Sequence, residues 1–409
     1  MRDFTSGAES EFFSSPFSHY PLSSEAPLQG DAMLHLITLA TLAVAASGSS
    51  QPNFLVLFPD QWRFDWTPDN AALAANLSMP TWASLRAKGT HFTKAFVPSP
   101  LCAPSRACLA SGREYDAAGV PDNFSNDYPV NQTTFYTLLR AAGYEVMTSG
   151  KDDLTKSSGP SLNGSYHASA LGFTKYARCD GKQDAAGSEP HEPYGAYCAA
   201  HWEIVNGTNE TLFQVYNSDM HSCGAGGYDC ERASVMPQEV YEDNWVANNA
   251  VDLLKNKKEG APWFLQVSFP GPHPPFVVTT SMMARTAGVI YPAAVDCTMA
   301  SAVQQVVRRD YAAELENLDL MFARVLAAVP ADELASTFII VASDHGEMLG
   351  DHNDWGKTLR AFLSMMTAME VGMQYLTPLF RSPPPAQLGK DLFQSRSSSL
   401  GPAFQKGRA

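Results

Sequence analysis

The segment Leu101–Arg113, which reads LCAPSRACLASGR, holds a cysteine and an arginine at a spacing that suits attack on an anionic group. Pro104 fixes its own φ and the residues after it can begin a helix, so we expect Cys102 near a helix N-terminus. Backbone N–H groups at such an end favour an anion, and Arg106 adds a guanidinium with bidentate oxyanion geometry. These residues predict a nucleophilic or metal-binding cysteine that acts on an anionic substrate. The alternative is a buried or disulfide-bonded cysteine.

Three apolar runs place further Asp and His residues at the ends of predicted strands. Residues 53–58, 263–269 and 337–342 read NFLVLF, WFLQVSF and TFIIVA, as expected for strands that are buried on both faces of a parallel sheet. Clusters with Asp or His follow each run, and helical patterns separate the runs. Because ligands bind at the carboxyl ends of parallel strands, we expect an α/β fold with a site along that edge of the sheet.

The remaining segments set the expected domain organisation. Helices are predicted at 80–88 (ending at Gly89), 133–142, 241–255 and 303–329, and a short strand at 144–148. Residues 155–235 are rich in Gly, Ser, Asn and Cys, so we expect a loop-rich insertion held by disulfides. We therefore expect a leader over 1–50, a catalytic domain over 51–360 and an unmatched, disordered tail over 361–409.

The composition excludes some classes of protein. The chain has 409 residues, of which 45% are hydrophobic, and this content excludes a disordered chain. Its 28 Lys and Arg against 42 Asp and Glu leave a net charge of −14, which argues against sequence-independent nucleic-acid binding. An anionic substrate stays possible, since a few Arg and Lys side chains can act locally.

The N-terminal region predicts entry into the secretory pathway. The 13 apolar residues 34–46 are too short for a membrane span but suit the h-region of a signal peptide, so we expect a signal-peptide-like segment at 33–46 and no stable span. Polar residues 1–32 precede it, and Met33 is the expected true start. The predicted product is a glycoprotein that is secreted, lysosomal or lumenal.

Glycosylation sequons and cysteines agree with that compartment. N-x-S/T sequons crowd into one part of the chain, at Asn76, Asn123, Asn131, Asn163, Asn206 and Asn209. An oxidising compartment would permit disulfides among Cys179, Cys198, Cys223, Cys230 and Cys297, with the pairing left open.

The string CAPSRACLASGR resembles the signature of the type I, formylglycine-dependent sulfatases of the alkaline-phosphatase-like superfamily. The resemblance implies that a formylglycine-generating enzyme oxidises Cys102, whose hydrated aldehyde then serves as the nucleophile in hydrolysis of a sulfate ester. It also implies a sandwich with a large, mostly parallel central sheet flanked by helices. Family members continue into a smaller C-terminal subdomain that residues 361–409 do not resemble, so we expect that subdomain to be missing or truncated.

Two further strings resemble the metal motifs of the family. NFLVLFPDQWR and SDHG imply Asp60, Gln61, Asp344 and His345 as ligands, together with Cys102 as formylglycine. Gln61 stands where many members have a second Asp and some have Gln. Such ligands suit one hard divalent cation, with Ca²⁺ implied and Mg²⁺ less favoured.

The resemblance also implies a catalytic set, namely Cys102, Arg106, Lys151, His273 and Lys357. Lys151, in a Gly-Lys pair, would hold the nucleophile and a sulfate oxygen, while His273 and Lys357 would assist departure of the alcohol. Asp153 stands where many members have a His and is a possible base. Asp351 and His352 are expected to orient a loop rather than to act in catalysis.

Three functions stay open on this evidence. The first is a sulfatase whose substrate is a sulfated small molecule or glycan, with a carbohydrate sulfate expected. The second is a phosphonate or phosphate ester hydrolase on the same scaffold, since such enzymes share the signature and the string DQWR. The third is an inactive, truncated sulfatase-like glycoprotein that only binds glycans.

Overall fold

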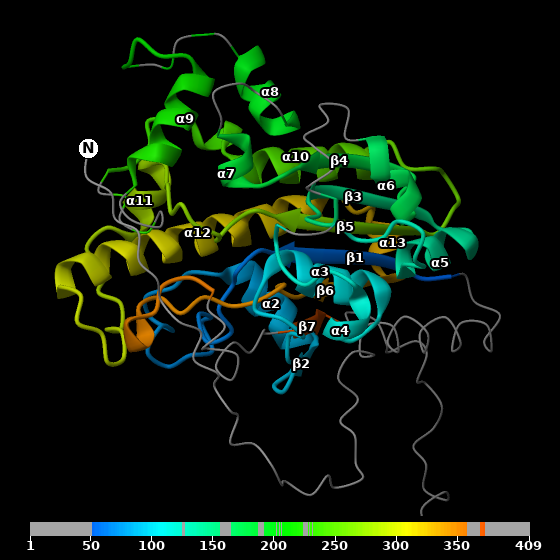
Figure 1. Cartoon of the computed structure of the whole chain (residues 1–409), viewed down its shortest axis with the longest axis horizontal. Coiled ribbons are helices and arrows are strands. Elements are labelled where there is room, and N and C mark those ends of the chain that lie inside the picture. The colour runs from blue at the N-terminus through cyan, green and yellow to red at the C-terminus, as the bar shows by residue number, and fades with distance from the viewer. Residues whose placement is uncertain are drawn as a thin grey trace, which may run out of the picture.

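A seven-stranded sheet lies at the centre of the protein, in the strand order β2-β7-β6-β1-β5-β3-β4 (Figure 1). The computed structural model describes residues 51–124, 127–155, 165–186, 192–201, 203, 205, 207–223, 228, 230, 232–357 and 369–372. The strands are β1 (Asn53–Pro59), β2 (Thr90–Phe92), β3 (Glu145–Lys151), β4 (Lys175–Cys179), β5 (Trp263–Phe269), β6 (Thr337–Val341) and β7 (Met369–Gly372). Strands β6, β1, β5, β3 and β4 run parallel, and β7 and β2 extend one edge in antiparallel pairings.

Strand β1 shows why its apolar run forms the centre of the sheet. All seven of its residues are buried. Phe54, Val56 and Phe58 face one hydrophobic cluster, and Leu55 and Leu57 face the other. Because side chains alternate along a strand, a continuous apolar run is required wherever both faces of the sheet are covered.

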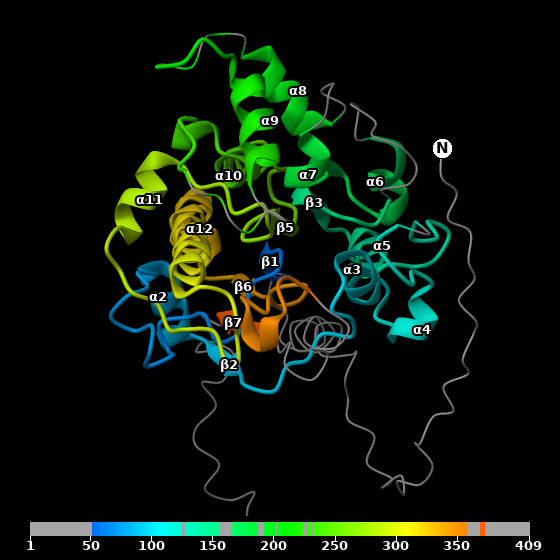
Figure 2. The same cartoon turned by 60° about the vertical axis from the view of Figure 1, so that its left-hand side comes forward.

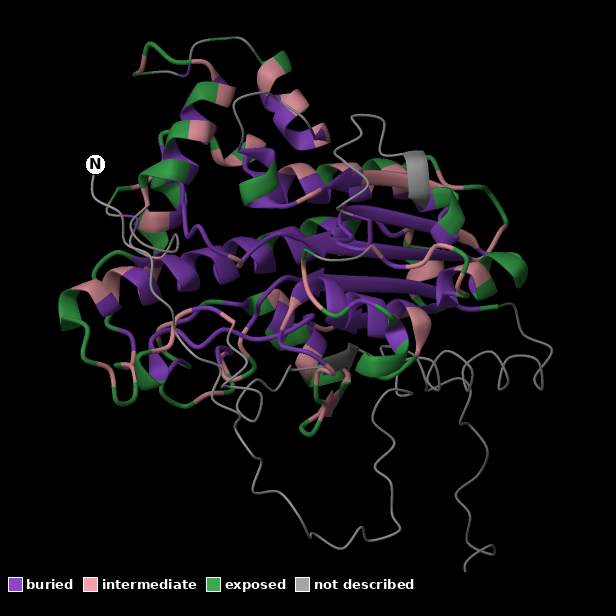
Figure 3. Cartoon of the chain, in the orientation of Figure 1, coloured by how far each residue is buried: buried purple, intermediate pink, exposed green. Residues whose placement is uncertain are grey.

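Helices cover both faces of the sheet (Figure 2). One face packs against α2 (Pro80–Lys88), α10 (Glu242–Lys255), α11 (Thr280–Thr286) and α12 (Ser301–Ala328). The other packs against α3 (Cys102–Ser111), α4 (Tyr115–Ala118), α5 (Phe135–Ala141) and α6 (Ser165–Leu171). Figure 3 shows the inner strands buried along their length. The expected α/β sandwich with a mostly parallel sheet is confirmed.

The remaining elements are α7 (Lys182–Ala185), α8 (Pro193–Ala200), α9 (Leu212–Ser222), η2 (Gln238–Val240), α13 (Ala331–Leu334) and η3 (Asp351–Asn353). Of these, α7, α8 and α9 fall within the segment 155–235, as do α6 and β4, so the prediction of loops there was wrong over these stretches. These helices have 4 to 11 residues, and such short elements show little periodicity.

The structure also bears on two other expectations, one about the C-terminal segment and one about the disulfides. Strand β7 lies within 361–409, for which the sequence predicted no regular structure, and it is the part of that segment that the structure describes. The loop insertion was expected to hold several disulfides, but the described part of the chain holds one, between Cys223 and Cys230. Cys179, Cys198 and Cys297 are unpaired, so of the five candidate cysteines Cys223 and Cys230 form the disulfide and the other three do not.

The predicted signal-peptide segment lies outside the described residues. Among the helices that the structure describes, none has both the length and the apolar composition that a bilayer span requires.

Candidate active site

The carboxyl ends of four neighbouring strands bring the predicted site residues together. Asp60 directly follows β1, Lys151 ends β3, and His273 lies in the loop after β5. Asp344 and His345 follow β6. Because these strands are parallel and adjacent, residues nearly 300 positions apart in the chain meet at one edge, as the apolar runs predicted.

Helix α3 places Cys102 at its first position, facing this edge. The preceding Leu101 is extended, so the helix begins at Cys102 as expected from Pro104. The side-chain oxygen of Asn123 accepts a hydrogen bond of 3.0 Å from the backbone N–H of Ala103. This contact satisfies one of the N–H groups that a helix start leaves unpaired, and it ties the cysteine to the loop that holds Asn123.

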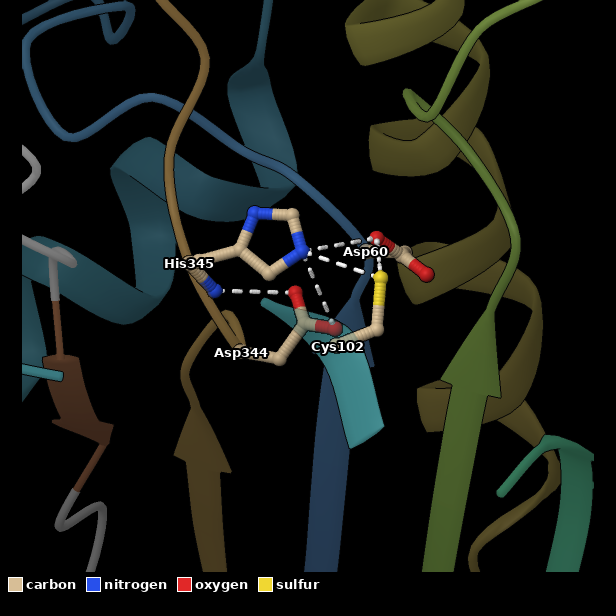
Figure 4. A group of neighbouring side chains, drawn as sticks. All are labelled: Asp60, Cys102, Asp344 and His345. Atoms are coloured by element: carbon tan, nitrogen blue, oxygen red, sulfur yellow. Dashed lines mark hydrogen bonds and ion pairs between the residues drawn. The ribbon is translucent and has the colours of Figure 1, made fainter. Parts of the chain in front are cut away.

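Four buried side chains form a group that could hold a metal ion (Figure 4). One ligand atom from each of Asp60, Cys102, Asp344 and His345 lies within 4.8 Å of the others. His345 Nε2 is 3.1 Å from Cys102 Sγ, 3.6 Å from Asp60 Oδ1 and 3.7 Å from Asp344 Oδ2. Two buried carboxylates beside an imidazole are a donor set that accepts a divalent cation.

Gln61 supplies a further oxygen next to this group. Its backbone N–H donates to Asp344 Oδ1 at 3.0 Å, and its side-chain Nε2 donates to Glu347. Its side-chain Oε1 is buried and has no hydrogen-bond partner within the described residues. An orphaned buried carbonyl oxygen is costly unless a cation or water satisfies it, so Gln61 fits the predicted ligand role.

Positive side chains surround the acidic pair and the thiol. Burial acts to raise the pKa of Asp60, but the positive charges of Lys151, Arg106 and Lys357 hold it well below its ordinary value. Burial and Asp60 act to raise the pKa of the Cys102 thiol, yet the neighbouring cationic groups outweigh them and lower it. The site therefore stabilises negative charge at the position of the Cys102 side chain.

The Arg106 guanidinium contacts three other residues of the site. Its Nε donates to Asp344 Oδ2 at 2.9 Å, and its Nη1 donates to the carbonyl of Lys151 at 2.7 Å. Its Nη2 lies 3.4 Å from Asp60 Oδ2, and the guanidinium lies over the ring of Phe58. Arg106 thus fixes both acidic residues, and its expected contact with oxyanion groups of a substrate stays a prediction.

Lys357 and His273 lie together against Cys102. Lys357 Nζ is 2.7 Å from Cys102 Sγ and 2.9 Å from His273 Nε2. The other ring nitrogen of His273 lies 2.5 Å from the carbonyl oxygen of Pro274. Burial and the charge of Lys357 lower the pKa of His273 well below its ordinary value. The imidazole is therefore neutral at pH 7, and its Nε2 accepts a hydrogen bond from Lys357 Nζ.

Asp153 lies beside Lys151 rather than in the cavity. Its carboxylate is buried, forms an ion pair of 3.1 Å with Lys151 Nζ and does not line the cavity above Cys102. Lys151 also contacts Asp60. In this position Asp153 can hold Lys151 in place, and its role as a base stays a prediction.

Asp351 and His352 lie away from the cysteine. Asp351 forms ion pairs with Arg63 at 2.6 Å and Arg308 at 3.0 Å and accepts from the backbone of Val295. His352 is exposed. The contacts of Asp351 anchor the loop after β6, as expected.

A cavity of about 260 Å³ opens above the cysteine, and residues that sequence reasoning missed line part of it. Asn123 was noted only as a sequon. Tyr228 also lines the cavity, and it lies between the disulfide-bonded Cys223 and Cys230 in the segment that was predicted as loops. A Cβ at Gly356 would lie 2.1 Å from the Tyr228 hydroxyl, so this approach requires glycine. No sequence motif marked either residue as part of the site.

Comparison with known proteins gives a family match over most of the chain. The family described as "Sulfatase" matches residues 52–383. An arylsulfatase of Clostridium perfringens is 24% identical over 334 residues, which cover 74% of this chain and 64% of that protein. A choline-sulfatase of Rhizobium meliloti is 25% identical over 338 residues, which cover 76% of this chain and 60% of that protein. The chain thus spans less than two thirds of the length of these two relatives.

The fold also resembles a solved structure. The phosphonate monoester hydrolase of Agrobacterium radiobacter superposes with a TM-score of 0.60 at 20% identity, covering 78% of this chain and 68% of that one. At this identity the similarity establishes the shared fold.

Proposed function

The chain belongs to the sulfatase family, and on that premise we propose that it hydrolyses a sulfate ester with a nucleophile derived from Cys102. The observation that carries the proposal is the position of Cys102 at the start of α3. Its Sγ lies within 3.8 Å of two lysine amines and next to the buried acidic group. The names of the two relatives, an arylsulfatase and a choline-sulfatase, support a sulfate ester as the substrate.

Cys102 is proposed to act after oxidation to formylglycine by a generating enzyme. The signature CAPSRACLASGR supports this modification, and the cavity leaves room for a substrate above the residue. The hydrated aldehyde would supply a nucleophilic oxygen where the thiol now lies. The same positive surroundings that lower the pKa of the thiol would favour the anionic form of that oxygen.

We propose that the group of buried side chains around Cys102 holds a divalent cation, which we assign as Ca²⁺. Asp60, Gln61, Asp344 and His345 would bind it together with the modified Cys102. The three carboxylate and amide side chains support a hard cation that prefers oxygen. When bound, the cation would stabilise negative charge on the nucleophile and on sulfate oxygens.

The residues of the chain have separate tasks in this proposal. Arg106 holds both metal-binding carboxylates, and Lys151 directs its charge toward the position of the nucleophile. Lys357 donates a hydrogen bond to neutral His273, so this pair can deliver a proton to the departing alcohol oxygen. Asp153 is assigned the positioning of Lys151, in place of the role of a base.

We further propose that the protein enters the secretory pathway. The sequon residues Asn131 and Asn209 are exposed, which suits glycosylation, and the disulfide between Cys223 and Cys230 suits an oxidising compartment. A carbohydrate sulfate is the substrate class that we assign first.

A phosphonate monoester hydrolase is the second candidate. The solved phosphonate monoester hydrolase shares this fold, and the string DQWR at residues 60–63 matches the pattern noted for such enzymes. A comparison of kcat/KM for an aryl sulfate and an aryl phosphonate with the same leaving group separates the two. A higher value for the phosphonate would reverse the order of the candidates.

Peptide mass spectrometry tests the nucleophile directly. The full chain is expressed together with a formylglycine-generating enzyme, and the peptide that contains Cys102 is analysed beside a Cys102→Ala control. We expect an aldehyde at residue 102 and turnover of an aryl sulfate by the unmutated protein alone. An unmodified thiol with no turnover would support the inactive, glycan-binding alternative.

A further inference from the structure

The loop that carries His273 is stiffened by proline. Residues 270–275 read PGPHPP, so four of the six have a φ that is fixed by the proline ring. The backbone N–H of His273 also donates to the carbonyl of Pro270 at 3.1 Å, which closes a turn. Because few backbone torsions stay free in this loop, a shift at one of its residues is carried along to the His273 side chain.

Asp243 holds this loop at Gly271. It lies in the first turn of α10 and is fully buried, and its Oδ1 accepts a hydrogen bond of 2.9 Å from the backbone N–H of Gly271. The carbonyl of the same glycine accepts from the backbone N–H of Asp60 at 3.1 Å. Both peptide groups of Gly271 are therefore fixed, one by Asp243 and one by a residue of the candidate metal site.

The contact between Asp243 and Gly271 is close and costly. A Cβ at position 271 would collide with Asp243 Oδ2, so this approach requires glycine. Burial raises the pKa of Asp243 to about 6, although Lys182 and the Gly271 N–H act to lower it. A buried carboxylate destabilises a fold unless it is hydrogen-bonded, and the hydrogen bond of this one goes to the His273 loop rather than to its own helix.

A second buried charge holds the other end of the loop. Lys182 Nζ donates to the carbonyl of Pro275 at 3.2 Å and forms an ion pair of 2.7 Å with Glu314 on α12. The side chains of both partners in this ion pair are fully buried. His273 thus lies between two anchored residues of one loop.

The contact of His273 with Lys357 depends on this placement. His273 Nε2 lies 2.9 Å from Lys357 Nζ, and both residues line the cavity above Cys102. A hydrogen bond no longer forms once donor and acceptor are about 3.6 Å apart, so a small shift of the loop breaks this one. Misplacing a catalytic group by about 1 Å can lower a rate by about 10²-fold.

We propose that Asp243 is a positioning residue, which holds the His273 loop so that His273 and Lys357 meet the oxygen of the departing alcohol. This inference rests on the proposed sulfatase activity. Within the described part of the chain Asp243 does not line the cavity, so it acts on the reaction through the loop.

Two aryl sulfates that differ in their leaving group test the proposal. One releases a strongly acidic phenol, which needs no proton to depart, and the other releases a weakly acidic phenol, which does. Asp243→Ala removes the acceptor for the Gly271 N–H and frees the loop. In the calcium-loaded, formylglycine-containing protein, kcat/KM for the weakly acidic phenol should fall about 10- to 100-fold, while kcat/KM for the other ester changes little.

Asp319→Ala is the matched control for loss of a buried carboxylate. Asp319 lies on α12, is almost fully buried and accepts from the backbone N–H groups of Thr81 and Trp82 at 2.9 and 2.7 Å. A merely structural loss lowers kcat/KM for both esters by one factor, as we expect for this control. The same uniform loss in Asp243→Ala would overturn the proposal.

Two further variants probe the same contact. Asp243→Asn keeps an oxygen that can accept from the Gly271 N–H, so the ratio of kcat/KM for the two esters should stay near that of the unmutated protein. Gly271→Ala leaves the buried carboxylate in place but displaces the loop, so it should reproduce the selective loss even where Asp243→Ala does not fold. A uniform loss in Gly271→Ala would count against the proposal.

Nuclear magnetic resonance of the histidine side chains separates failure of this proposal from failure of the proposed function. The full chain is prepared with isotope-labelled histidine, and the His273 signals are identified by their loss in His273→Gln. We expect these signals to shift in Asp243→Ala and to stay in place in Asp319→Ala, whether or not a sulfate ester is hydrolysed. Unshifted His273 signals in Asp243→Ala would overturn the proposal, whereas a lack of turnover by the unmutated protein would overturn the proposed function alone.

Discussion

Replacing Gln61 by Glu would place a second carboxylate against Glu347 inside the protein. Gln61 Nε2 donates to Glu347, and both side chains are almost fully buried. Glu347 also accepts from the backbone N–H groups of Leu349 and Gly356, so it cannot turn away without leaving those donors unpaired. The geometry therefore explains why an amide suits position 61 in this chain, and it predicts a measurable penalty for an acid there.

The penalty is limited by protonation of one of the two carboxyl groups. Two charges about 4 Å apart repel by about 4 kcal/mol at an effective dielectric constant of about 20. Protonating a carboxyl of ordinary pKa about 4.3 at pH 7 costs about 3.7 kcal/mol, so the cheaper outcome is one shared proton. We expect Gln61→Glu to lose about 3–4 kcal/mol of unfolding free energy at pH 7. At about 2–4 °C per kcal/mol, Tm would fall by about 6–16 °C.

The stability lost in Gln61→Glu depends on pH because the substitution shifts the pKa of a carboxyl group in the folded state. The variant raises a carboxyl pKa in the folded state above its unfolded value, so the deficit grows with pH above the unfolded pKa. Lowering the pH from 7 to 5 should narrow the difference from the unmutated protein by about 1.4 kcal/mol per pH unit.

Thermal melts in a chelator measure this effect without a metal ion. Adding Glu347→Gln to the variant restores an amide–carboxylate pair with its direction reversed, so we expect most of the lost stability to return. Glu347→Gln alone is the control for loss of that carboxylate. The reasoning is refuted if Gln61→Glu melts with the unmutated protein at pH 7, or if the second substitution gives no rescue.

Two further outcomes are expected. Asp153→Asn removes one of the two anionic partners of Lys151, so kcat/KM for an aryl sulfate should fall about 5- to 30-fold, for about 1–2 kcal/mol. A general base would lose about 10²- to 10⁴-fold, and a loss of that size would return the role of base to Asp153. Asn123→Ala removes a hydrogen-bond acceptor at the start of α3, and the loss of about 1 kcal/mol should lower kcat/KM about fivefold. Glycopeptide mapping should find Asn123 unmodified because this residue lines the cavity.

The sequence alone determined the central strands, the main helices and the residues at their ends. The run at 53–58 could only form a strand covered on both faces, and Pro104 placed the start of a helix next to Cys102. These predictions succeeded because they depend on local periodicity and on φ restrictions, which a short window of sequence contains. The resemblance of the signature around Cys102 to that of the sulfatases indicated which reaction to expect at this edge of the sheet.

The tertiary structure alone decided how the side chains are paired. Asp153 was a possible base by its spacing from Lys151, yet the backbone turn at φ +54° places it in a buried ion pair with that lysine. Tyr228 reaches the cavity from a disulfide-closed loop, and Asp180 and Asp184 reach it from a turn fixed by a buried ion pair on another helix. Such contacts join residues that are far apart in the chain. They follow from strand order and side-chain packing, which no local pattern in the sequence encodes.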